Sequence, residues 1–189
     1  MGVVIVMTLT SDRKFPKAKS SSFTLVELLV VISIIGLLAG LGLPAINGAI
    51  KAGKKAEVSA MAESIKTAVN AFYAEYSAYP TNSSGQCYTN TSLEFLSLIS
   101  TTTNTNGANY RGIAFLEVPP KFTNSTDGLV TPTGFYSGGK QSNFSLAIDA
   151  NGAGVLTNKV GSKSYVVPAS ISVWVSDQSD STKPVGTFK

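Results

Sequence analysis

The sequence of 189 residues contains no histidine, one cysteine and one tryptophan, and only 14% of its residues are charged. The absence of histidine excludes imidazole catalysis and every histidine-ligated metal site. Cys87 by itself can form neither an intramolecular disulfide nor a cysteine-based zinc site. The sequence also lacks a Gly-x-Ser-x-Gly elbow, a phosphate-binding loop and a paired-acid motif, so we expect no enzymatic activity.

The formal net charge of +4 is concentrated at the N-terminus. Residues 1–22 contain four basic residues and one acidic residue, a net +3, so the chain from Phe23 onward carries +1. The charged residues of this leading segment are Asp12, Arg13, Lys14, Lys17 and Lys19. No basic cluster with interleaved aromatic residues follows, and we therefore expect no nucleic-acid partner.

A long apolar run follows the basic segment. Residues 28–46 are nineteen residues without a charge, close to the roughly 20 that an α-helix needs to cross a bilayer core. Glu27 stands at the leading edge of this run, where a carboxylate is costly unless it is hydrated or paired. Either Glu27 lies at the headgroup level of a plain signal anchor, or it has a specific partner.

The segment Ser22-Phe23-Thr24-Leu25-Val26-Glu27, continued by LLVVI and preceded by a basic leader, resembles the N-terminal signature of the type IV pilin and type II secretion pseudopilin superfamily. The resemblance implies that a prepilin peptidase cleaves between Ser22 and Phe23 and that Phe23 is then N-methylated. It also implies that the Glu27 carboxylate neutralises the amino-terminal charge of a neighbouring subunit during assembly. Ser22 departs from the family pattern, which has glycine before the cut.

From Lys51 to Tyr79 the apolar residues recur at intervals of three and four, which predicts an amphipathic helix that continues the membrane helix. We expect it to end at Tyr79, before Pro80. The segment Ala71 to Thr81 resembles the helix exit of major pseudopilins. The predicted buried face consists of Val58, Met61, Ala62, Ile65, Ala68, Val69, Phe72, Tyr73 and Tyr76.

The remaining chain predicts a small β domain. Short β-prone runs separated by Gly, Asn, Asp and Pro occur after a short helical island at residues 93–99. The expected strands are residues 113–118, 144–148, 154–156, 165–167 and 171–175. We therefore predict an α+β, pilin-like fold in which a long N-terminal helix, first membrane-spanning and then amphipathic, packs on a small antiparallel sheet.

Calcium is the one ligand that the resemblance suggests, because major pseudopilins hold it in a C-terminal loop. The candidate oxygen ligands are Asp149, Asn151, Asp177 and Asp180. The tract Ser172 to Asp180 resembles the Trp-containing strand and loop of that family, but the Gly-x-Asp-Gly pattern that normally follows is missing. The alternative interpretation is an Asn-Gly turn together with a solvated acidic loop. No other cofactor is expected.

The predicted organisation is a leader peptide (1–22), a transmembrane and assembly helix (23–50), its amphipathic continuation (51–80) and a globular headpiece (81–189). We expect a single-pass protein of the bacterial inner membrane with its C-terminal domain in the periplasm or outside the cell. The predicted function is that of a structural subunit of a pilus-like filament, a type II secretion pseudopilin that drives protein export. A minor type IV pilin and a membrane-anchored binding module that does not polymerise are the alternatives.

The expected partners follow from the resemblance. They are further copies of the chain, other pilin-like subunits, the prepilin peptidase, an inner-membrane assembly platform and membrane lipid. The lone Cys87 favours a pseudopilin, because type IVa pilins generally close a C-terminal loop with a disulfide.

Overall fold

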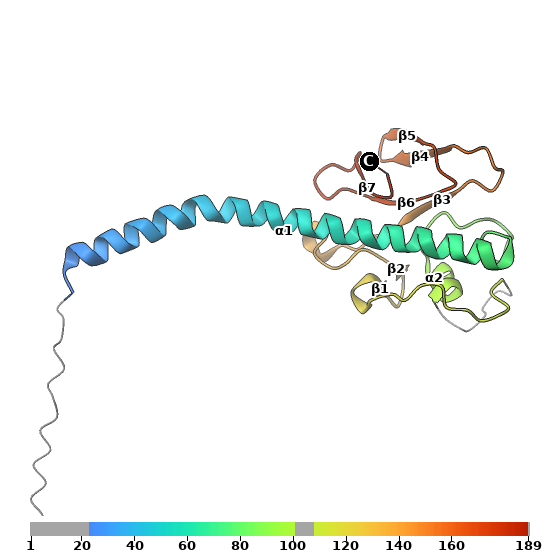
Figure 1. Cartoon of the computed structure of the whole chain (residues 1–189), viewed down its shortest axis with the longest axis horizontal. Helices are drawn as coiled ribbons and strands as arrows, with labels where there is room; N and C mark the ends of the chain where they lie inside the picture. The colour runs from blue at the N-terminus through green and yellow to red at the C-terminus, as the bar shows by residue number, and fades with distance from the viewer. Residues whose placement is uncertain (1–22, 101–107, 189) are drawn as a thin grey trace, which may run out of the picture. The chain divides into compact units, whose positions relative to one another are not determined.

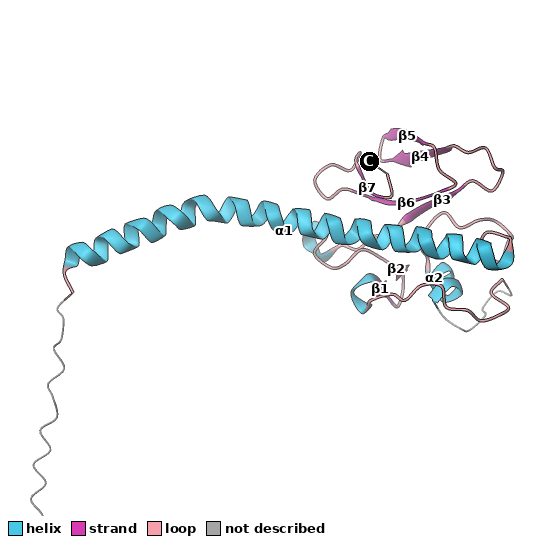
Figure 2. Ribbon diagram, in the orientation of Figure 1, coloured by secondary structure: helices cyan, strands magenta, loops and turns pink. Residues whose placement is uncertain are grey.

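The computed structural model describes residues 23–100 and 108–188. The chain divides into two units, Met1–Pro44 and Ala45–Lys189. Helix α1, Leu25–Tyr76, has 52 residues and contributes to both. Figure 1 shows the order of the elements along the chain, and Figure 2 separates helices, strands and loops. The predicted leader, residues 1–22, and the cleavage residue Ser22 lie outside the described residues.

The first unit contains the apolar part of α1. From Phe23 to Gly40 every residue is exposed. An 18-residue stretch of the helix reaches a mean hydropathy of 2.5 with none of it buried. The helix is therefore long and apolar enough to cross a membrane, as the sequence predicted.

The second unit contains the other elements. Two 3-10 helices, η1 and η2, accompany the α-helices and strands. In chain order they are α2 (Leu93–Ser100), η1 (Pro120–Phe122), β1 (Thr123–Asn124), β2 (Gly128–Leu129), η2 (Ser137–Gly139), β3 (Ser145–Ile148), β4 (Leu156–Val160), β5 (Lys163–Val167), β6 (Ile171–Ser176) and β7 (Pro184–Gly186).

The strands form three small antiparallel sheets. Strand β6 lies between β3 and β7, with Ser145 opposite Trp174 and Val175 opposite Val185. Strands β4 and β5 form a hairpin, and β1 pairs with β2. In Figure 1 the sheets of β3 to β7 lie on one side of the C-terminal half of α1, and α2, β1 and β2 lie on the other. The α+β architecture of a long helix with a small antiparallel sheet region is confirmed.

The core of this unit forms around the periodic face of α1. Val58, Ala62, Ile65 and Val69 are fully buried. They belong to one apolar cluster with α2, which supplies Phe95, Leu98 and Ile99, and with β3 and β6, which supply Leu146, Ile171, Val173 and Val175. Eight of the nine residues predicted for the face are buried or partly buried, whereas Tyr73 is 45% exposed and stacks on Tyr79. The amphipathic prediction is therefore confirmed except at Tyr73.

Asn109 holds the end of α1 against α2. Its side chain is fully buried and accepts hydrogen bonds from the Tyr76 hydroxyl (2.6 Å) and the Ile113 amide (3.0 Å). Its amide nitrogen donates to the carbonyls of Leu98 (3.0 Å) and Ile113 (2.8 Å). One polar side chain thus connects the last turn of α1, the end of α2 and the turn that follows.

Three boundary predictions were wrong. Helix α1 ends at Tyr76 rather than Tyr79, because Ser77 adopts a left-handed φ of 52°. Residues 113–118 form no strand: Phe115 and Leu116 both donate their amides to the Ile99 carbonyl, so this segment caps α2 and joins no ladder. Only Leu156 of the predicted strand 154–156 lies in β4, which continues to Val160.

Candidate functional site

Helix α1 begins with a capping box. The Thr24 amide and the Thr24 hydroxyl both donate to Glu27 Oε2 at 2.8 Å. In return the Glu27 amide donates to Thr24 Oγ1 at 3.2 Å. The four orphan amides at a helix start need such acceptors, and a Thr-x-x-Glu sequence provides them reciprocally. The Thr-x-x-Glu pattern can be recognised in the sequence, but the role of Glu27 in helix capping was not predicted from it.

Glu27 keeps one carboxylate oxygen available. Both printed bonds from Thr24 end on Oε2, and Oε1 accepts no hydrogen bond within residues 23–100 and 108–188. The Glu27 side chain is exposed, and Phe23 at the start of the described chain is 71% exposed. The arrangement can therefore hold the helix start with one oxygen and receive a further donor with the other.

The four calcium candidates lie at opposite ends of strand β6. Asp149 follows β3 and donates its amide to the Ser170 carbonyl, just before β6 begins, and Asn151 lies in the loop after it. Asp177 and Asp180 follow the other end of β6. Six strand residues at about 3.3 Å each separate the two pairs by about 20 Å. The structure therefore does not bring the four residues together into one site.

The carboxylates of these candidates already have partners. Asp149 accepts the amides of Ala153 (3.0 Å) and Gly154 (2.6 Å), and these bonds, that of Gly154 first, lower the pKa of its carboxyl group. Asp180 accepts the hydroxyl and the amide of Thr182, which lower its pKa in the same way. Within the described residues no group of three or more acidic, His or Cys side chains could hold a metal. Calcium binding itself stays a prediction.

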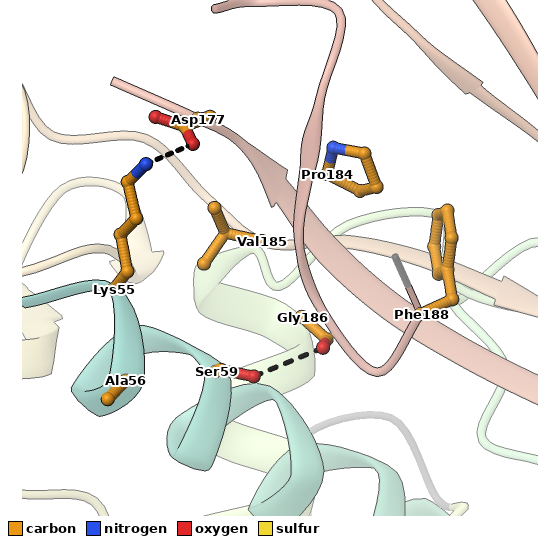
Figure 3. A pocket seen from close by; sticks show the side chains of 8 residues that line it. All are labelled: Lys55, Ala56, Ser59, Asp177, Pro184, Val185, Gly186 and Phe188. Carbon is orange, nitrogen blue, oxygen red and sulfur yellow. Dashed lines mark hydrogen bonds and ion pairs between the residues drawn. The ribbon is translucent and has the colours of Figure 1, made fainter. Parts of the chain in front are cut away.

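Asp177 instead ties the C-terminal strands to α1. Its carboxylate lies 2.5 Å from Lys55 Nζ, and its side chain is only 9% exposed. One turn further along the helix, the Ser59 hydroxyl donates to the Gly186 carbonyl at 3.1 Å. Figure 3 shows both contacts at the edge of a hollow of about 350 Å³, which Pro184, Val185 and Phe188 also line.

Cys87, the single thiol, is partly buried and forms no disulfide. Burial raises the pKa of this thiol, which disfavours the reactive thiolate.

Comparison with known proteins identifies the N-terminal segment. Residues 17–43 match the family described as the prokaryotic N-terminal methylation motif. The chain is 38% identical over 60 residues to a fimbrial protein of Neisseria meningitidis, a match that covers 32% of this chain and 35% of the relative. It is 38% identical over 60 residues to a type IV major pilin protein of Neisseria gonorrhoeae, covering 32% of this chain and 36% of the relative.

A fimbrial protein of Eikenella corrodens is 36% identical over 64 residues, which cover 34% of this chain and 42% of the relative. The chain thus spans about a third of the length of the curated relatives that it matches first. No solved structure matches the chain. The family match, residues 17–43, contains Phe23 and Glu27.

Proposed function

We propose that this chain, a member of the type IV pilin and type II secretion pseudopilin superfamily by its N-terminal segment, is a structural subunit of a pilus-like filament. The observation that carries the proposal is Glu27 at the start of the exposed, apolar half of helix α1. A helix that is apolar on all sides gains little from a carboxylate if it only anchors the protein. A subunit that must pair with a neighbour's amine gains a specific contact.

The chemistry of assembly follows from the capping box. After cleavage at Ser22, Phe23 would carry the amino group, and the adjacent Thr24 would still cap the helix through Glu27 Oε2. The free Oε1 would receive the charged amine of a second copy. A complementary pair removes much of the cost of holding two separate charges in an apolar environment.

The finer assignment is a type II secretion pseudopilin that drives protein export. The unpaired Cys87 supports it, because this headpiece has no disulfide loop. The type IV pilin remains a second candidate, since the relatives are named fimbrial proteins and major pilins. A membrane-anchored binding module that does not polymerise is the third.

The proposal has consequences for processing and location. We expect the prepilin peptidase to be the processing partner and Phe23 to be N-methylated. We place the apolar helix across the bacterial inner membrane with the headpiece in the periplasm or outside the cell, next to an assembly platform. We expect no enzymatic activity.

The first test is the N-terminal residue and intact mass of the protein recovered from a membrane that contains the peptidase. A chain that starts at methylated Phe23 would agree with the proposal. A chain that retains Ser22 would leave Glu27 without an amine partner and would favour the anchored binding module.

A variant series at the helix start separates charge from capping. Glu27→Gln keeps an acceptor for Thr24 and removes the charge, so filament assembly should be lost while membrane insertion persists. Thr24→Ala weakens the cap by about 1 kcal/mol but keeps the carboxylate, so filaments should still form. The readout is filament yield by electron microscopy beside membrane fractionation.

Glu117→Gln is the matched control, because Glu117 is an exposed carboxylate of the headpiece. It should assemble normally. Normal filaments from Glu27→Gln would contradict the role given to the charge, and a loss confined to Thr24→Ala would assign Glu27 to helix capping alone.

A further inference from the structure

A second hollow lies beside the part of α1 that follows the apolar run. It has a volume of about 360 Å³ and belongs entirely to the unit Ala45–Lys189. One wall is formed by α1, the other by the η2 segment and the loop after β6. Its lining residues are Asn47, Ile50, Lys51, Lys54, Gly134, Phe135, Tyr136, Ser137 and Gln178.

Two lysines give the hollow a positive charge. Lys54 Nζ donates to the Gly134 carbonyl at 2.7 Å, and Lys51 is exposed at the rim. Neither ammonium pairs with a carboxylate in the described part of the chain. The next lysine, Lys55, instead reaches the other hollow and pairs with Asp177. Carboxylates of residues 23–100 and 108–188 therefore do not neutralise the two positive charges at this site.

Gln178, which lines the hollow, has an unused hydrogen-bond donor. The amide nitrogen of Gln178 is buried and has no acceptor among the described residues. Gln178 and Tyr136 also line an adjoining polar hollow of about 430 Å³, where Lys140 adds a third cation without a carboxylate partner in the described chain. Buried hydrogen-bond donors are normally satisfied. An unsatisfied donor beside ammonium groups therefore favours an anionic acceptor.

Tyr136 adds no opposing charge to this site. Its hydroxyl donates to the Ser176 carbonyl at 2.7 Å. Burial first, and the nearby Asp177 second, raise the pKa of Tyr136 to about 12. The phenol therefore stays neutral at physiological pH, and the nearest carboxylate, Asp177, is held by Lys55.

The position of the hollow, directly after the apolar run of α1, indicates that the anion is a lipid headgroup. The first charged residue after Glu27 is Lys51, and the apolar side chains Ile46 and Ile50 that precede it are both exposed. Asn47 to Lys54 covers about 11 Å of helix, so this segment, following directly on the apolar run, extends through a headgroup layer of about 5–8 Å on that side of the bilayer core. A ligand here would find apolar side chains on the membrane side and ammonium groups on the water side.

We propose that this hollow binds the phosphate of an anionic lipid headgroup, with Lys51 and Lys54 as its counter-charges and Gln178 as a donor. The inference rests on the proposed function, because it applies to the subunit while its helix is in the bilayer. An ammonium group beside a bilayer attracts an anionic headgroup by Coulomb attraction, which falls off within a Debye length. A subunit that leaves the membrane for a filament gives up this contact, so the site favours the stored state.

The experiment is a titration of the full ¹⁵N-labelled chain, in nonionic detergent micelles, with dihexanoylphosphatidylglycerol. The amide signals of Lys51, Gly134, Ser137 and Gln178 should shift with a saturable dependence on lipid concentration. Dihexanoylphosphatidylcholine should bind at least tenfold more weakly, because its headgroup has no net charge. Higher salt should weaken the binding of the anionic lipid.

Substitutions of Lys51 and Lys54 test whether their charges bind the lipid. Lys51→Gln should weaken the binding of dihexanoylphosphatidylglycerol about fivefold, and Lys51→Gln with Lys54→Gln more than twentyfold. Lys163→Gln is the matched control, since Lys163 is an exposed lysine of β5 without an ion pair in the described chain, and it should leave the affinity unchanged.

Three outcomes would overturn the inference. They are equal binding of the zwitterionic lipid, equal losses in Lys51→Gln and Lys163→Gln, and saturation of the same signals by inorganic phosphate as readily as by the lipid, which would mark a free-anion site. A Lys51→Gln variant with unchanged lipid affinity but impaired filaments would also overturn it, in favour of an interface between copies. Because the titration uses dispersed subunits, its result is separable from the assembly test on Glu27.

Discussion

The two halves of helix α1 are both rich in apolar residues, yet they meet different surroundings. From Phe23 to Gly40 every residue is exposed, whereas between Val58 and Phe72 seven residues are buried at successive intervals of three or one. The first half is apolar on all sides, so no single surface of its own chain can cover it. The second half confines its apolar side chains to one face, which the headpiece covers.

Periodicity, rather than hydrophobicity, indicates which part of a helix folds against its own domain. The apolar half needs lipid or several neighbouring copies, since only a surrounding medium can cover all of its faces. The periodic half needs one partner surface and finds it in α2, β3 and β6.

The largest expected effect is the loss of stability when a buried side chain in the second half of α1 is truncated, compared with an exposed one in the first half. Phe72→Ala should lower the free energy of unfolding by about 3–5 kcal/mol, because Phe72 is 1% exposed and packs on Phe115. Ile34→Ala, at a residue 53% exposed in the apolar half, should change it by less than about 0.5 kcal/mol. Urea unfolding of the full chain in nonionic detergent, followed by Trp174 fluorescence, measures both. Similar losses in the two variants would contradict the comparison.

A second, smaller effect is expected from removing the hydrogen bonds of Asn109, which hold the buried half of α1. Asn109→Ala should cost about 2–3 kcal/mol, because it leaves buried partners such as the Leu98 carbonyl unsatisfied. Tyr76→Phe removes one bond of the same network and should cost about 1 kcal/mol. Asn151→Ala, at an exposed asparagine, is the control with no expected loss. Equal costs in Asn109→Ala and Asn151→Ala would show that the network does not fasten α1.

The smallest effect is the response of the loop of residues 149–154 to acid. Because its hydrogen bonds lower the pKa of Asp149 below the ordinary value of 3.8, the stabilisation of the 149–154 loop is complete above pH 3.8 and is lost as the pH falls through the lowered value. The amide signals of Ala153 and Gly154 should be constant from pH 5 to 8 and should move at lower pH. Asp149→Asn should abolish that movement, and its persistence in this variant would assign it to another group.

The sequence predicted the long helix, its change of pattern and most of its buried face, because a 3.6-residue period is a property of the helix alone. Tyr73 escaped the pattern because it stacks on Tyr79, a partly buried residue beyond the helix end, instead of entering the core. Such a partner depends on how the chain turns at Ser77, which no periodicity encodes.

The strands were harder to predict because pairing depends on distant segments. Residues 113–118 have strand-like composition, but the nearest acceptor is the end of α2. Strand β7 was missed because Pro184 and Gly186 are typical of a turn; an edge strand tolerates both. The calcium candidates were grouped by residue type, and only the length of β6 shows that they belong to two separate loops.

The contact between Ser59 and Gly186 joins residues 127 positions apart in the chain. Strand β7, Pro184–Gly186, makes this contact and is synthesised well after α1. The face of α1 that β7 helps to cover therefore stays uncovered at this point until β7 has been produced. We therefore expect the headpiece to close slowly for its size, and a chain that ends before β7 to expose part of this apolar face to other proteins.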